Sequence, residues 1–172
     1  MIMPQGQQLL LPANPVFVWS TLVVALLLSM LPLGRVPWMP DFLALVLLFW
    51  CVHQPQRVGI GSAFAFGLIM DVHQTALLGQ HAWSYTMLAF FAALVHRRIL
   101  WFRVPSQSLQ LFPLFFGAFA LELLIRLVSD GGWPGWLILL KPVLTTALWP
   151  LVSVFLLAPQ RRAPNPDATR PL

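Results

Sequence analysis

The chain has 172 residues, of which 59% are hydrophobic and only 9% are charged, and its mean hydropathy is +0.79. A soluble domain is roughly 45 to 50% apolar and about 25% charged, so this composition excludes a soluble enzyme and predicts an all-α polytopic membrane protein. The net charge of +5 does not indicate a nucleic-acid partner, because the basic residues lie at the ends of apolar segments rather than together on one polar face.

Three regions are predicted along the chain. Residues 1–15 form a short polar leader without Lys or Arg, which does not resemble a secretory signal. Residues 16–158 form the transmembrane domain, which has room for about six spans because each span takes roughly 20 residues. Residues 159–172 form a Pro- and Arg-containing tail that we expect to be disordered and cytoplasmic.

Six helices with short loops are expected within the transmembrane domain. In chain order they are Val16–Leu33, Trp38–Val52, Val58–Leu78, Gln80–Val95, Leu109–Ser129 and Trp136–Leu157. The second is short for a span, since its length of about 22 Å is less than the roughly 30 Å hydrocarbon core. Gly79 is the best candidate for the break between the third and fourth helices, and Pro150 is expected to kink the sixth.

Small residues recur at every fourth position of the third helix, at Gly59, Ala63 and Gly67. Such a stripe lets two helix backbones approach closely, so it predicts a packing contact between transmembrane helices. The next step of four reaches Asp71. A lipid-facing Asp costs roughly 2.5 to 3.5 kcal/mol, so the carboxylate should face the bundle interior.

Other ionisable residues are expected in the same outer half of the bundle. Glu122 and Arg126 are spaced to pair along one helix face. Asp71 lacks a partner in its own helix, so Arg126, Lys141, a hydroxyl or water must meet its charge, or a proton must neutralise it. We hypothesise an intramembrane polar cluster of Asp71, Glu122 and Arg126. Asp41 has two interpretations, as the cap of the second helix or as part of a polar site.

The distribution of basic residues predicts the orientation of the six spans. With both termini inside, seven of the ten basic residues fall at cytoplasmic ends: Arg57, Arg97, Arg98, Arg103, Arg161, Arg162 and Arg170. Only Arg35 falls in an outer loop. This asymmetry follows the positive-inside rule and favours an N-in, C-in topology.

No catalytic, cofactor-binding or metal-binding residue is predicted. His73 and His81 do not have a standard metal-ligand spacing, and we expect them at the membrane interface. The single cysteine, Cys51, lies in an apolar run and excludes an internal disulfide. The sequence contains no phosphate-binding Gly loop and no nucleophile motif.

An ordered set of residues lies between Val16 and Leu157. Its most specific part runs from Pro40-Asp41 through Gly67-Leu68 and Asp71 to Gly79 and Tyr85. The remaining positions are Phe42, Leu43, Trp50, Pro55, Gly59, the basic turn His96-Arg97-Arg98, and Leu148-Trp149-Pro150. This ordered set resembles the MreD family of rod-shape-determining proteins.

The resemblance implies a small inner-membrane protein of rod-shaped bacteria that acts as a partner rather than as an enzyme. Its implied partners are MreC and, with it, the actin-like MreB and the elongation-specific glycosyltransferase and transpeptidase. No cofactor is implied. The expected function is therefore a membrane scaffold of lateral cell-wall elongation.

Two alternatives belong to other classes of protein. One is the solute-binding subunit of a vitamin-uptake transporter, in which an intramembrane acid would line a ligand cavity. The first helix here lacks the Ala-x-x-x-Ala pattern of such subunits, and Ala25 followed by Ser29 comes nearest. The other alternative is a lipid-handling protein. A cavity lined by Asp71 and Glu122 would favour either alternative, whereas a tightly packed interior would favour the scaffold.

Overall fold

The computed structural model describes residues 14–31, 38–130, 132–133 and 135–160, and all regular secondary structure within these ranges is helical. The all-α class predicted from composition is confirmed. The helices are α1 Pro15–Met30, α2 Phe42–His53, α3 Ile60–His73, α4 Gln80–Leu100, α5 Val104–Asp130, the 3-10 turn Trp136–Leu139, α6 Leu140–Ala147, α7 Trp149–Leu157 and a final 3-10 turn Ala158–Gln160. The predicted leader and tail lie outside the described residues, except at 14–15 and 159–160.

Several helix ends differ from those predicted. The third helix stops at His73 instead of Leu78, because residues 74–79 form a turn in which Thr75 has a positive φ of 51°. The fifth begins at Val104 instead of Leu109, because Pro105 lies in its first turn, where the ring costs no backbone hydrogen bond. The sixth is interrupted at Leu148, so that Pro150 lies in the first turn of α7.

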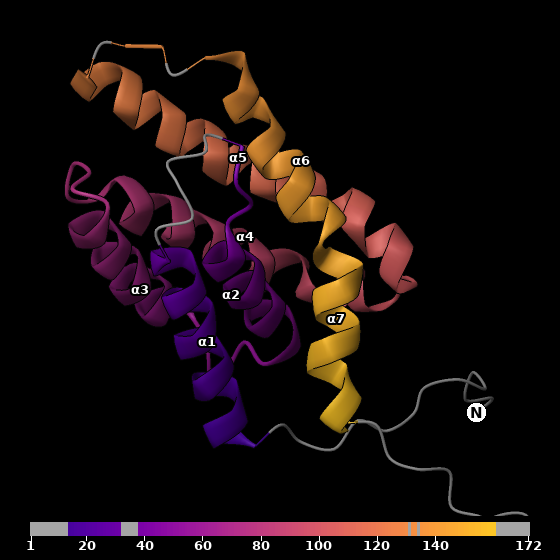
Figure 1. Ribbon diagram of the computed structural model, residues 1–172. Coiled ribbons are helices and arrows are strands. Elements are labelled where there is room, and N and C mark those ends of the chain that lie inside the picture. Colours follow the sequence, from indigo (N-terminus) through magenta and orange to yellow (C-terminus); the bar gives the residue numbers. More distant parts are fainter. Residues whose placement is uncertain (1–13, 32–37, 131, 134, 161–172) are drawn as a thin grey trace, which may run out of the picture.

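Helix α2 forms the centre of the molecule (Figure 1). Nine of its 12 residues are buried, on every side of the helix. It contacts α1, α4, α6 and α7. The Trp50 side chain is fully buried, and its indole N–H donates to Thr21 Oγ1 at 2.9 Å. A helix that is apolar all round is typical of a buried core element, which explains why α2 can be short.

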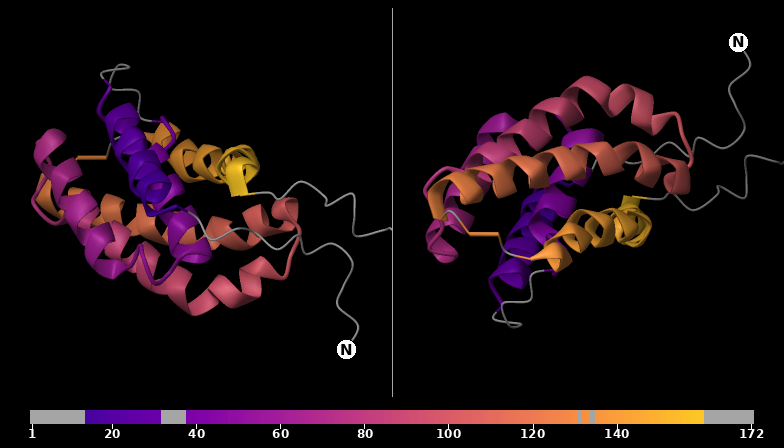
Figure 2. Two further views of the ribbon diagram at one scale, coloured as in Figure 1. Left: turned by 90° about the horizontal axis from the view of Figure 1, so that it is seen from below. Right: turned by 90° about the horizontal axis from the view of Figure 1, so that it is seen from above.

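The helix connections alternate between two ends of the molecule. In Figure 2 the turn between α4 and α5 and the end of α7 lie at one end, and the connections from α3 to α4 and from α5 to α6 lie at the other. In Figure 1, α1 begins and α7 ends at the same lower edge. Successive helices therefore run in opposite directions for most of the chain.

Two helical runs, Val104–Ser129 and Trp136–Gln160, are long and apolar enough to cross a membrane. The apolar helices α1, α2 and α3 have 16, 12 and 14 residues. At about 1.5 Å per residue they measure roughly 24, 18 and 21 Å, so each would need flanking residues to cross a core of roughly 30 Å.

Candidate functional site

The Asp71 carboxylate, near the end of α3, caps the N-terminus of the next helix. It is fully buried and accepts hydrogen bonds from the backbone N–H groups of Gly79 at 2.8 Å, His81 at 2.7 Å and Ala82 at 3.3 Å. The first N–H groups of a helix have no partner within the helix, and a negative charge is stabilised there. The charge of Asp71 is thus met chiefly by backbone groups of α4.

Two glycines make this cap possible. Gly79 precedes α4 with φ at +105°, a conformation that other residues rarely adopt, and it has no side chain to cap the helix itself. Gly67 lies where α3 meets α4, and a Cβ there would fall 2.4 Å from Ala82 Cα and 2.8 Å from the His81 carbonyl oxygen. The two backbones therefore touch beside the carboxylate.

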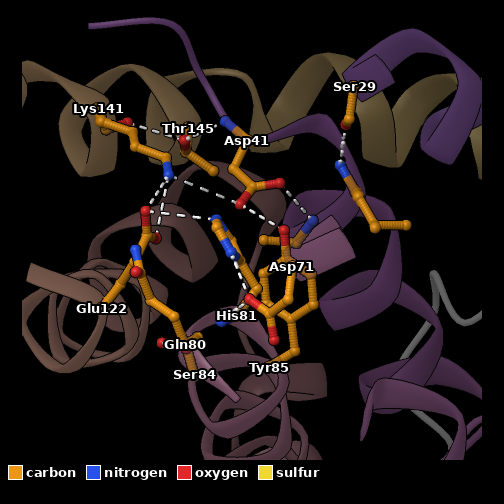
Figure 3. A network of polar contacts seen from close by, with 12 residues as sticks. Ser29, Asp41, Asp71, Gln80, His81, Ser84, Tyr85, Glu122, Lys141 and Thr145 are labelled. Carbon is orange, nitrogen blue, oxygen red and sulfur yellow. Dashed lines mark hydrogen bonds and ion pairs between the residues drawn. The ribbon is translucent and has the colours of Figure 1, made fainter. Parts of the chain in front are cut away.

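His81 links this cap to a second carboxylate. Its Nδ1 lies 2.9 Å from Asp71 Oδ1, and its Nε2 lies 3.5 Å from Glu122 Oε1 on α5. The Lys141 ammonium, on α6, donates to both oxygens of Glu122 at 3.0 Å. The side chains of α3, α4, α5 and α6 are thus joined in one chain of polar contacts (Figure 3).

The other end of this chain of contacts is Asp41, the N-cap of α2. Its Oδ1 accepts from the Ala44 N–H at 2.9 Å, and its Oδ2 accepts from the Tyr85 hydroxyl at 2.7 Å. Its backbone N–H donates to Thr145 Oγ1 at 3.0 Å, and Lys141 Nζ lies 4.0 Å from Oδ2. Asp41 is therefore both a helix cap and a member of a polar site, so its two interpretations hold together.

We call this set the buried polar network, and it consists of Asp41, Asp71, His81, Tyr85, Glu122, Lys141 and Thr145. Its side chains come from five helices and converge in Figure 3. The cavity beside it is lined in part by Asp41, Tyr85, Glu122 and Lys141 and measures about 20 Å³, which is room for about one water molecule. The network is therefore a closed set of contacts rather than a ligand cavity.

The structure places the other predicted site residues as follows. Ala63 and Gly67 are buried in the bundle, but Gly59 is the N-cap of α3, and a Cβ there would meet only the Pro55 carbonyl oxygen at 3.8 Å. The small-residue contact therefore begins at Ala63. Arg126 is exposed on α5, one turn beyond Glu122, and the cation that holds Glu122 in the network is Lys141.

The late Trp149-Pro150 pair belongs to a separate contact, between α7 and α5. Trp149 is fully buried, and its indole N–H donates to Gln107 Oε1 at 3.2 Å, which ties α7 to the start of α5. Pro40 lies directly before Asp41, where its fixed φ restrains the chain entering α2.

The sequence analysis did not predict His81 as a network residue. It placed His81 at the membrane interface. The available signal was spacing. His81 and Tyr85 lie four apart, as do Lys141 and Thr145, so each pair shares one face of its helix. In the described part of the chain no group of three or more His, Cys, Asp or Glu is arranged to hold a metal ion. The contacts of the network hold the helices in fixed relative positions.

Removing the Tyr85 hydroxyl tests how far the network stabilises the fold. We expect Tyr85→Phe to lower the free energy of unfolding by about 1 to 3 kcal/mol, because Asp41 Oδ2 loses its 2.7 Å hydrogen bond. Denaturant unfolding of the purified protein measures this loss. The matched control is Thr86→Val, because among the described residues the Thr86 hydroxyl bonds only to Ala82 O of its own helix. Equal losses in the two variants would contradict the prediction.

Comparison with known proteins identifies the family. Residues 11–158 match the family described as rod shape-determining protein MreD. The rod shape-determining protein MreD of Haemophilus influenzae is 34% identical over 146 residues, which cover 80% of this chain and 86% of that protein. No solved structure matches the chain. These are structural, shape-determining proteins rather than enzymes, and this chain belongs to the MreD family.

Proposed function

We propose that this protein is a non-enzymatic scaffold of the bacterial lateral cell-wall elongation machinery, embedded in the inner membrane by six spans with both termini in the cytoplasm. Membership of a rod shape-determining family supports the role in cell shape. The alternation of helix connections between two ends supports the six spans. The described arginines at the end that holds the α4–α5 turn support its assignment to the cytoplasmic side.

The scaffold binds MreC and, with it, MreB and the elongation glycosyltransferase and transpeptidase. In the proposed orientation, the buried polar network lies toward the periplasmic side, near the connections from α3 to α4 and from α5 to α6. The network joins five helices at that level, so it holds the outer rim of the bundle in one arrangement. A rim fixed in this way is a suitable docking surface for periplasmic partners, because little of it must be ordered on binding.

The observation that carries this proposal is the close packing around the buried polar network. A site for a vitamin-sized solute needs a cavity of roughly 300 to 1,000 Å³, whereas the cavity at the polar network measures about 20 Å³. The Asp71 carboxylate makes four hydrogen-bond contacts at the start of α4, and Asp71 does not line that cavity. A scaffold fits this packing better than a solute-binding subunit does.

Depletion of the protein in its host tests the function. We expect rod-shaped cells to round up, the wild-type gene to restore rods, and Asp71→Ala to fail because the cap of α4 is lost. The matched control is Gln74→Ala, an exposed position in the following turn, which should restore rods. Immunoblots of membranes distinguish an absent variant from an inactive one.

Two outcomes would contradict the proposal. If depleted cells keep their rod shape, the protein has no role in elongation in that host. If they keep their shape but grow only when a vitamin is supplied, the transporter alternative replaces the scaffold.

A further inference from the structure

An apolar groove runs along the surface between α4 and α5. Its volume is about 460 Å³, and its lining includes Met87 and Phe91 of α4 and Pro113, Gly117 and Leu124 of α5. It is open to the outside, because Met87, Phe91 and Leu124 are 37%, 45% and 58% exposed. A Cβ at Gly117 would meet no atom within 4 Å, so nothing in the described part of the protein fills the groove there.

The groove points toward a cluster of positive charge. Met87, Phe91, Leu94 and Arg98 follow one another at steps of four, three and four residues, so they lie along one face of α4. Leu94 continues the apolar surface and is 64% exposed. The groove's α4 wall therefore leads to Arg98, beside Arg97 and close to the turn before α5.

This positive charge has no carboxylate partner in the part of the chain that the structure describes. Arg97, Arg98 and Arg103 are exposed, and none forms an ion pair with a carboxylate in the described part of the chain. The sequence contains no Asp or Glu from residue 72 to residue 121. Three guanidinium groups near the α4–α5 turn, to which the apolar face of α4 leads, are complementary to an anionic headgroup that carries an apolar chain.

We propose that the α4–α5 groove binds an anionic phospholipid, with the phosphate at Arg97, Arg98 and Arg103 and an acyl chain along Phe91, Gly117 and Met87. The inference rests on the proposed orientation, in which these arginines lie at the cytoplasmic leaflet. The length of α4 between the arginines and the groove agrees with the depth of one leaflet. From Arg98 to Met87 is 11 residues, or about 16 Å of helix, and half of a roughly 30 Å hydrocarbon core is about 15 Å.

A lipid fits this groove better than a partner helix does. A bound helix would leave the three guanidinium groups without an anion, unless it supplied acidic residues at that depth. A phospholipid supplies both the thin apolar chain and the negative charge.

The test is binding of phosphatidylglycerol to the purified full-length protein in neutral detergent, with bound lipid counted by native mass spectrometry. We expect Arg97→Gln with Arg98→Gln to weaken binding by roughly 25-fold, since each basic residue at an anionic lipid contributes about fivefold. Gly117→Leu, which fills the groove, should weaken it by about tenfold or more. Phosphatidylcholine should bind weakly to every form.

Each variant has a matched control. Arg97→Lys with Arg98→Lys keeps the positive charge at the same two positions, and Gly61→Leu adds the same side chain at a glycine of α3 that also has no atom within 4 Å. Both controls should bind phosphatidylglycerol as the wild type does.

Three outcomes would overturn the proposal. Unchanged binding in both variants removes the site. A loss with the arginine variant alone means that the headgroup binds at the surface and the groove is not used. If Gly117→Leu abolishes association with a second protein chain but leaves lipid binding intact, the groove is a protein interface. None of these outcomes depends on the cell-shape assay, so a failure of the scaffold function would be seen separately.

Discussion

Replacing Gly67 with Ala is expected to lower the free energy of unfolding by about 3 kcal/mol. The added Cβ would lie 2.4 Å from Ala82 Cα and 2.6 Å from Ala82 N, and both atoms belong to the backbone of α4. A backbone cannot turn aside as a flexible side chain can, so α3 and α4 must separate. Their separation also lengthens the hydrogen bonds from α4 to Asp71. Denaturant unfolding of the purified protein measures the loss.

The control for Gly67 is Gly61, which lies in the same helix. A Cβ at Gly61 would meet no atom within 4 Å, so Gly61→Ala should leave stability unchanged or raise it by up to about 1 kcal/mol through helix propensity. In cells, Gly61→Ala should restore rod shape and Gly67→Ala should not. If the two alanine variants are equally stable, the close contact of α3 with α4 is wrong.

The small-residue stripe shows how far the sequence alone could reach. Spacing by four placed Ala63, Gly67 and Asp71 on one face of a helix and predicted that a neighbouring helix packs there. It also included Gly59, which the structure places at the helix N-cap. The four-residue spacing includes Gly59, but the helix begins only at Ile60. Spacing alone does not show where a helix begins, because the boundary depends on the turn that precedes it.

The partner of Asp71 could not be found from charge alone. A search for cations indicated Arg126 or Lys141, but backbone N–H groups are present at every position and leave no mark in the sequence. The sequence signal for this contact is Gly79. Gly79 stands at the start of a helix without a capping side chain, and an acid eight residues earlier in the chain can cap the helix in its place.

His81 was misplaced for a related reason. A histidine near a helix start in a membrane protein is typical of the water interface, and only the folded α3–α4 hairpin brings its ring between Asp71 and Glu122. In the same way, Asp41 and Tyr85 are 44 residues apart in sequence. Contacts at that separation depend on how helices pack, which neither composition nor periodicity determines.

Replacing Lys141 with Met is expected to lower the free energy of unfolding by about 3 kcal/mol or more. Met keeps a similar length and fills the same space, but Glu122 loses an ammonium that lies 3.0 Å from both of its oxygens. The side chains of Lys141 and Glu122 are 17% and 14% exposed, so water offers little compensation. Removing one partner of such a pair leaves an uncompensated charge, which costs roughly 3 to 5 kcal/mol.

The double variant separates the cost of the unpaired charge from the worth of the pair. Glu122→Gln with Lys141→Met should recover most of the stability, because replacing both partners of a buried pair is often close to neutral. Arg126→Met removes a positive charge one turn from Glu122, but that side chain is exposed, so the expected loss is below about 1 kcal/mol. If Arg126→Met costs as much as Lys141→Met, or if the double variant is no more stable than Lys141→Met alone, then Lys141 is not the cation that holds Glu122 in the network.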